Sequence, residues 1–189
     1  MKLRSLFSLS GLILAQTLVM TTVAQARDFS LVAPFECIKL KNDQGGARFA
    51  TIALKANNEP TSPLLLWKTQ EFSESGYTPE RRCYEVTDRL NRAVAQNGGN
   101  VGNLWLTIGM LNNLPVLCYV NNTNAGCDRS NVLFTLNKKN GTDPSKVIAS
   151  LVNFSLSGRN SAIEETSGLP YVNLGQLIEA ASKPNQSSR

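Results

Sequence analysis

Residues 104–120 read LWLTIGMLNNLPVLCYV, and this stretch is the clearest indication of the fold class. It consists of two apolar runs on either side of Asn112 and Asn113. Asn readily adopts the positive φ that a tight hairpin turn needs, and Pro115 is tolerated at the start of a strand. We therefore expect an antiparallel hairpin with strands over residues 104–110 and 115–120.

The segments around this hairpin predict further strands. Residues 35–40 and 48–55 alternate apolar and polar side chains, and the turn-rich residues 42–46 lie between them, so they predict a second hairpin. Residues 64–67 (LLLW) form a short apolar run after two prolines, which is typical of a buried strand. Residues 131–136 predict another strand.

A helix over Pro79–Gln96 is the strongest single prediction. Thr78 is a good N-cap residue, Pro79 suits the first helical position, and Gly98 supplies a stop. Between them, apolar residues recur at helical spacing. They are Cys83, Val86, Leu90, Ala93 and Val94.

The same helix carries four arginines, which suggests a face that binds anions. They are Arg81, Arg82, Arg89 and Arg92. Three acid–base pairs are spaced four residues apart, however, and such side chains are neighbours on a helix surface. The pairs are Arg81 with Glu85, Glu85 with Arg89, and Asp88 with Arg92. We therefore expect most of this charge in solvated ion pairs.

The C-terminal third predicts two more helices. Residues 140–144 read as a turn that leads into a helix capped by Asp143 or Thr142. Its inward residues would be Val147, Ile148, Leu151 and Phe154. Asn173 would cap a last short helix that carries Leu174, Leu177 and Ile178. Hairpins with helices inserted between sheet segments indicate an α+β fold: a mainly antiparallel sheet with two or three helices, stapled by disulfides.

The N-terminus predicts export. A short basic start, a diluted apolar stretch and the exit Ala24-Gln25-Ala26 form a secretory signal over residues 1–26, cleaved after Ala26. Residues 27–182 then form a single exported domain, and residues 183–189 form a polar C-terminal tail. The compartment would be extracytoplasmic: the periplasm, the thylakoid lumen or the outer face of the plasma membrane.

The four cysteines are consistent with an extracytoplasmic compartment. An even number of cysteines in an oxidising compartment indicates two disulfides, for which three pairings are possible. The turn-rich segment between Cys118 and Cys127 favours a bond between these two, which leaves Cys37 to pair with Cys83.

Several segments together resemble a known family. They are Phe35-x-Cys37, Leu66-Trp67, GYTPERRC over residues 76–83, LTIG over 106–109, PVLC over 115–118, and Cys127 followed by LFTL over 133–136. The chain resembles the cyanobacterial circadian-oscillating-polypeptide family over about residues 35–155. The resemblance implies an extracytoplasmic domain at the membrane periphery. It also implies that the four cysteines form a structural framework rather than a catalytic site. It implies no catalytic activity and no cofactor.

The composition argues against several chemistries. The chain has no His, so the commonest general base and metal ligand is missing. It contains neither Gly-x-Ser-x-Gly nor Cys-x-x-Cys, and the side chains of the adjacent Glu164 and Glu165 would point apart. A formal charge of +5 without clustered Lys and Arg gives no reason to expect nucleic acid. We therefore expect no catalytic residue, no metal and no cofactor.

Two aromatic residues are candidates for a surface contact. Phe72 and Tyr77 lie in the polar loop over residues 70–79, whereas Trp67, Trp105 and Phe134 lie in strand patterns that predict core positions. A loop aromatic can instead cap the core, since burial of its apolar area is favourable.

Two classes of function are compatible with these observations. The first is a non-enzymatic extracytoplasmic binding or accessory domain, peripheral to a membrane, that contacts membrane-surface proteins or anionic lipid headgroups. The second is an extracytoplasmic hydrolase with a non-standard, His-free site. The missing base–nucleophile motif favours the first class.

Overall fold

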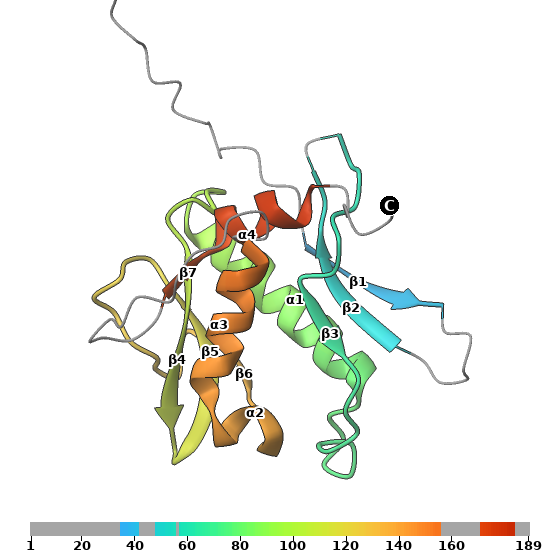
Figure 1. The fold of residues 1–189 in the computed structure, drawn as a ribbon, viewed down its shortest axis with the longest axis vertical. Helices are drawn as coiled ribbons and strands as arrows, with labels where there is room; N and C mark the ends of the chain where they lie inside the picture. The colour runs from blue at the N-terminus through green and yellow to red at the C-terminus, as the bar shows by residue number, and fades with distance from the viewer. Residues whose placement is uncertain (1–34, 42–47, 56, 156–170, 184–189) are drawn as a thin grey trace, which may run out of the picture.

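The structure is a computed structural model that describes residues 35–41, 48–55, 57–155 and 171–183 (Figure 1). The predicted signal peptide, Glu164 and Glu165, and all but the first residue of the predicted tail lie outside these ranges. Within them the chain forms two antiparallel sheets and four helices. The α+β prediction is confirmed, with more helices than the two or three expected.

The first sheet has the order β1-β2-β3, in which β1 (Phe35–Leu40) and β2 (Arg48–Ala53) form the predicted hairpin. The short strand β3 (Leu65–Trp67) pairs with β2 and places Trp67 opposite Phe49. Both aromatic side chains are buried. The apolar run over residues 64–67 thus becomes a strand that closes one side of the core.

The second sheet has the order β6-β5-β4-β7. Strands β4 (Trp105–Leu111) and β5 (Leu114–Val120) form the hairpin predicted from residues 104–120, and Asn112 and Asn113 adopt φ values of 49° and 60° in its turn. Strand β6 (Val132–Thr135) confirms the prediction for residues 131–136. The sequence did not predict β7 (Tyr171–Asn173), a three-residue strand that pairs with β4.

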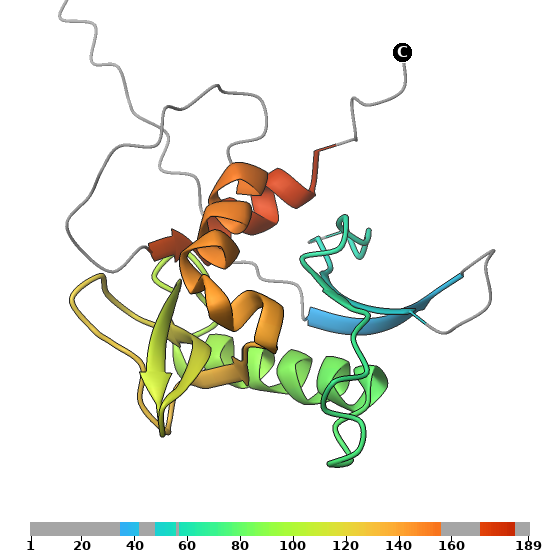
Figure 2. The same cartoon turned by 60° about the horizontal axis from the view of Figure 1, so that its bottom comes forward.

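Helix α1 has the predicted bounds Pro79–Gln96. The Thr78 hydroxyl accepts a hydrogen bond from the Arg81 amide at 3.2 Å, and Gly98 adopts a φ of 66° just beyond the end. Its apolar side packs against all three strands of the first sheet and against β6, so the helix joins the two sheets (Figures 1 and 2). Val86, Leu90 and Val94 are buried, as their spacing predicts.

The turn expected over residues 140–144 is wrong in part, because a five-residue helix, α2 (Lys138–Thr142), occupies most of it. The Asn137 side chain caps α2 by accepting a hydrogen bond from the Asn140 amide at 2.8 Å. Helix α3 (Pro144–Ser155) follows directly, with Ile148 and Leu151 buried and Val147 half-buried. The expected inward position of Phe154 falls on a side chain that the structure does not describe.

Helix α4 (Leu174–Ala181) begins where the sequence predicts. The Asn173 side chain accepts from the Gln176 amide at 3.1 Å, while the same residue ends β7. Helix α4 packs against α3, and its last residue accepts a hydrogen bond from the Ser62 amide in the segment between β2 and β3. The C-terminal helix therefore also links the two halves of the molecule.

Both expected disulfides are present. Cys37–Cys83 joins β1 to α1, and Cys118–Cys127 joins β5 to the segment that leads to β6. The pairing favoured by the spacing is thus the one observed. In the part of the chain that the structure describes, no helix has the length and apolar character to cross a membrane.

Candidate functional site

The β4–β5 turn carries exposed apolar side chains. Met110 is 62% exposed and Leu114 is 52% exposed, although both lie in a sheet whose other apolar residues are largely buried. The register pairs Met110 with Pro115 and Leu111 with Leu114, so these residues flank the two-residue asparagine turn directly. Neither exposed side chain is needed to fill the core, because both point into solvent.

Helix α2 lies beside this turn. The Leu136 amide donates to the Pro115 carbonyl at 2.9 Å, and a Cβ on Gly141 would lie 2.9 Å from Pro115 Cγ. The missing side chain of Gly141 therefore allows α2 to approach the hairpin closely. We call the turn (residues 110–114) together with α2 the hairpin-tip surface.

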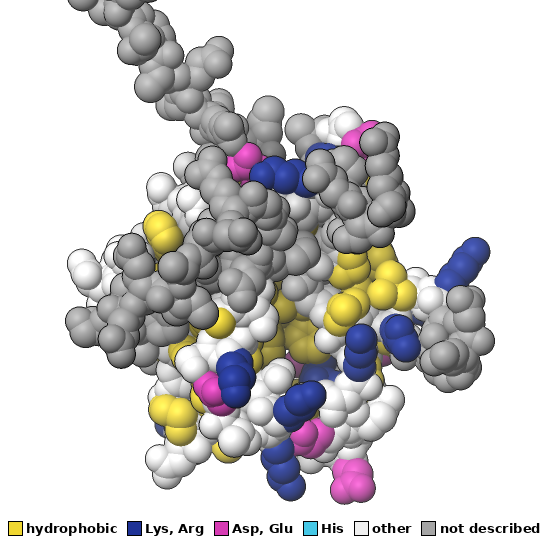
Figure 3. Space-filling model, viewed as in Figure 1, with side chains coloured by type: hydrophobic (Ala, Val, Ile, Leu, Met, Phe, Trp, Pro, Cys, Tyr) yellow, Lys and Arg dark blue, Asp and Glu magenta, His cyan; other side chains and the backbone are white. Residues whose placement is uncertain are grey.

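The hairpin-tip surface is cationic as well as apolar. Lys138 and Lys139 are exposed, and among the described residues neither forms an ion pair. Lys146 at the start of α3, by contrast, pairs with Asp143 at 3.0 Å. Figure 3 shows hydrophobic side chains and several Lys or Arg side chains, with some Asp or Glu side chains among them, at the lower end of the molecule, where Figure 1 places the β4–β5 turn and α2.

One acidic residue from the loop between β3 and α1 borders this surface. The Glu71 carboxylate accepts hydrogen bonds from the Lys138 amide at 2.9 and 3.2 Å. This contact spans 67 residues of sequence and fixes the loop against the start of α2. The negative charge of Glu71 is thus directed at backbone N–H rather than at a lysine ammonium group.

The predicted contact residues Phe72 and Tyr77 lie in this loop, and their role as a surface contact stays a prediction. Tyr77 is 43% exposed, and the Arg81 guanidinium lies 4.7 Å from its ring centre. Phe72 is half-buried and packs on the Arg82 guanidinium at 5.5 Å. The two residues therefore differ: Tyr77 is accessible, whereas Phe72 holds a neighbouring side chain.

Arg82 differs most from the expectation that the arginines of α1 lie in solvated ion pairs. Its guanidinium lies over the rings of Trp67 and Phe72, at 5.6 and 5.5 Å from their centres, and donates to the Thr69 carbonyl, while its buried Nε has no hydrogen-bond partner among the described residues. Burial lowers the pKa of Arg82, and the Glu71 carboxylate opposes this effect. The side chain anchors the loop to the first sheet through stacking.

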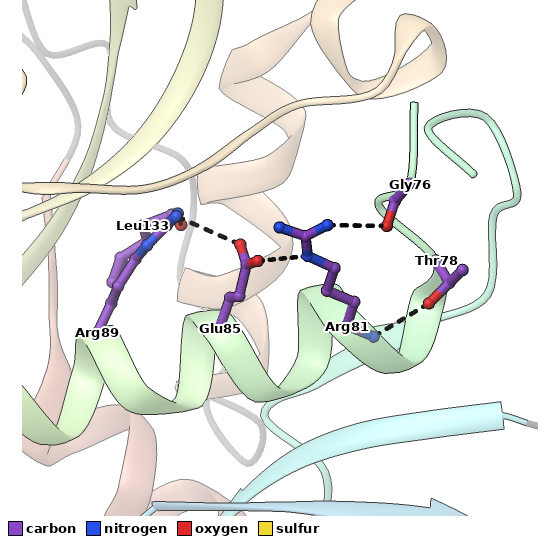
Figure 4. A network of polar contacts seen from close by, with 6 residues as sticks. All are labelled: Gly76, Thr78, Arg81, Glu85, Arg89 and Leu133. Atoms are coloured by element: carbon purple, nitrogen blue, oxygen red, sulfur yellow. Dashed lines mark hydrogen bonds and ion pairs between the residues drawn. The ribbon is translucent and has the colours of Figure 1, made fainter. Parts of the chain in front are cut away.

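The remaining α1 arginines form the expected ion pairs, two of which share one glutamate. Glu85 accepts from Arg81 at 2.7 Å and lies 3.5 Å from Arg89, which also donates to the Leu133 carbonyl on β6 (Figure 4). Arg92 pairs with Asp88 at 2.8 Å. The carboxylate of Glu85 raises the pKa of Arg81 through its hydrogen bond and its charge.

Few of the described side chains are available to act as an acid, a base or a metal ligand. All four cysteines are disulfide-bonded. Within residues 35–41, 48–55, 57–155 and 171–183, no three Cys, Asp or Glu side chains gather as metal ligands would. The Asp128 carboxylate is occupied by the amide and hydroxyl of Ser130, and these hydrogen bonds lower its pKa.

Sequence reasoning missed the hairpin-tip surface. The lysine pair is visible in the sequence, but its place beside Met110 and Leu114 depends on the packing of α2 against Pro115. A usable signal was the apolar character of residues 110–111 and 114, which flank the turn where polar residues are usual.

Comparisons with known proteins agree with the resemblance seen in the sequence. No curated protein and no solved structure matches the chain. The sequence profile of the family described as circadian oscillating protein COP23 matches residues 34–179, which include both sheets and both disulfides. This chain therefore belongs to the circadian oscillating protein COP23 family.

Proposed function

We propose that this protein is a non-enzymatic extracytoplasmic accessory domain that binds peripherally to an anionic membrane surface. The observation that carries the proposal is the hairpin-tip surface, where Met110 and Leu114 are exposed next to α2, whose Lys138 and Lys139 are exposed and form no ion pair among the described residues. Apolar side chains at such a tip can enter the interfacial region of a bilayer while the lysines contact headgroups.

The expected affinity is modest and depends on salt. Each lysine near an anionic surface contributes about 1 kcal/mol, and burial of the two apolar side chains adds about 25 cal/mol for each Å² removed from water. The lysine contribution is screened over a Debye length of about 10 Å at 0.1 M salt and about 3 Å at 1 M. Such a contact holds a domain reversibly, unlike a transmembrane helix.

The cysteines support the compartment in this proposal. Two disulfides suggest an oxidising, extracytoplasmic setting, since cytosolic proteins rarely keep such bonds. The absence of His from the chain and the bonded state of the cysteines support a binding role over a catalytic one.

The test is co-sedimentation of the purified secreted protein with lipid vesicles. We expect binding to vesicles that contain phosphatidylglycerol, weaker binding to phosphatidylcholine alone, and release at 1 M salt. The double variant K138Q/K139Q and the single variant Leu114→Ser should each reduce binding. Binding that persists until detergent is added, or no binding to either vesicle, would contradict the proposal.

A matched control separates the tip from general surface hydrophobicity. Leu66 on β3 is 49% exposed, close to the value for Leu114, but it belongs to the other sheet. Leu66→Ser should leave vesicle binding unchanged. An equal loss for Leu66→Ser and Leu114→Ser would show that the hairpin tip has no special role.

A further inference from the structure

A groove with arginines from two elements lies at the other end of β5. A hollow of about 340 Å³ opens between the second half of α1 and the segment that follows β5. Arg89 and Arg92 line it from α1, and Arg129 lines it from the segment between β5 and β6. The segment carrying Arg129 lies on the same side of the molecule as the C-terminal end of α1 (Figure 2).

The three arginines are not equally neutralised. Arg92 has its own partner, Asp88, but Arg89 shares Glu85 with Arg81. Arg129 is exposed and, among the described residues, has no ion pair or hydrogen bond. The ion pairs on α1 neutralise the charges of Arg89 and Arg92 only. Arg129 comes from another part of the chain, so its positive charge remains in the hollow.

A second hollow of about 380 Å³ continues from the first. Gln96, Tyr119 and Ser130 line both, so the two form one groove along the last turns of α1. The second half adds one charged side chain, Asp128; its other additional side chains are amides, such as Asn97 and Asn121, and apolar groups. Each half has a size typical of a site for a small molecule.

Covalent and polar contacts hold the outer wall of this groove. The disulfide Cys118–Cys127 ties the wall to β5, and the Tyr171 hydroxyl donates to the Ala125 carbonyl at 2.9 Å. The side-chain amide of Asn131 donates to the Gly126 carbonyl at 2.9 Å. A wall fixed in this way loses little conformational freedom when a ligand binds.

We propose that this groove binds a sugar that carries an anionic group. Guanidinium groups bind phosphate and carboxylate oxygens in bidentate geometry, which places the anion among Arg89, Arg92 and Arg129. The amides and hydroxyls of the second half can hydrogen-bond to sugar hydroxyls. The Asp128 carboxylate also lines this second half. Ser130 donates both of its hydrogen bonds to Oδ1, so Oδ2 can accept from a sugar hydroxyl, and the negative charge repels an anion placed at that end.

The groove and the hairpin-tip surface are independent sites. Tyr119 lies five residues along β5 from Leu114, which corresponds to about 17 Å at the usual rise of a strand. A protein seated on a membrane by its hairpin tip would therefore keep the groove accessible. Failure of one proposal leaves the other standing, since their variants do not overlap.

The test is an NMR titration of the ¹⁵N-labelled full domain with four probes. Glucose 6-phosphate and glucuronate carry a sugar and an anion, glucose carries only the sugar, and inorganic phosphate carries only the anion. We expect shifts of the Gln96 side-chain amide and the Ser130 backbone amide with both anionic sugars. Glucose and phosphate should bind at least about tenfold more weakly, since each lacks one set of hydrogen bonds.

Variants connect binding to the proposed residues. Arg129→Gln should weaken binding of both anionic sugars about tenfold, through loss of a charge-assisted hydrogen bond, and leave the rest of the spectrum unchanged. Arg48→Gln, at an exposed position at the start of β2, is the matched control and should have no effect. No response to either anionic sugar, equal binding of phosphate, or full binding by Arg129→Gln would each overturn the proposal.

Discussion

Gly109 on β4 leaves no room for a side chain. A Cβ at this position would lie 2.8 Å from both Cβ and Sγ of Cys127, so the disulfide Cys118–Cys127 packs directly on the strand. We expect Gly109→Ala to lower the free energy of unfolding by about 1–3 kcal/mol, as overpacking of a closed site does.

Chemical denaturation measures this effect, and the same segment supplies a control. A Cβ on Gly126 would meet nothing within 4 Å, so Gly126→Ala should change the stability little. Equal stabilities for the two variants would show that the disulfide can move away from β4.

Asp128, in the segment after β5, makes the stability of the protein depend on pH. Hydrogen bonds from Ser130 lower the pKa of this carboxyl in the folded state. Its contribution to stability is therefore present above the unfolded pKa of about 3.9 and is lost as the pH falls through the lower folded value. Asp128→Asn should flatten the dependence of stability on pH between about pH 5 and pH 2. Denaturation curves across this range provide the measurement, and an unchanged slope would refute the assignment.

At the scale of the element, α1 separates a core face from a solvated face. Leu90 is buried beneath the helix, so Leu90→Ala should cost about 2–5 kcal/mol as a cavity-forming truncation. Arg92 and its partner Asp88 are exposed, so Arg92→Ala should stay within about 0.5 kcal/mol of the parent. Urea midpoints compare the two variants, and identical midpoints would reject the assignment of faces.

Elements differ in how well the sequence predicts them. Helix α1 begins at Pro79 and ends at Gln96 as expected, because Thr78, Pro79 and Gly98 act on the backbone within a few residues of themselves. Strand β7 has no comparable local signal: its three residues are strand only because they pair with Trp105, Leu106 and Thr107. Helix α2 was missed because Asn140 and Gly141 are typical turn residues, and the cap at Asn137 outweighs them.

At the scale of the whole molecule, the two disulfides constrain chain segments of different length. Cys37–Cys83 spans 46 residues and joins the first sheet to α1, whereas Cys118–Cys127 spans 9 residues. Loop-closure entropy predicts losses of about 4 and about 2.7 kcal/mol, respectively, when each bond is removed. Paired Cys→Ala variants, measured by denaturation under oxidising conditions, should show the larger loss for Cys37 and Cys83. The opposite order would contradict the entropic account.

Features whose cause is local can be predicted from the amino-acid sequence. The Asn112 and Asn113 turn, the cap and periodicity of α1 and the spacing of Cys118 and Cys127 act over short stretches of chain, where backbone preference and solvent exposure suffice to select the structure. The family also follows from residues that the sequence displays directly.

Which surface residues lie together depends instead on how distant segments of the chain pack. The contact between Glu71 and Lys138 crosses 67 residues, and Arg129 faces α1 residues that precede it by 37 and 40 positions. Such neighbours depend on how the sheets and helices of the described residues pack around the core. Exposed side chains contribute little to that packing, so their sequence pattern does not indicate it. The hairpin-tip surface and the arginine groove are therefore products of the fold, since burial of the core fixes the positions of residues that are not buried themselves.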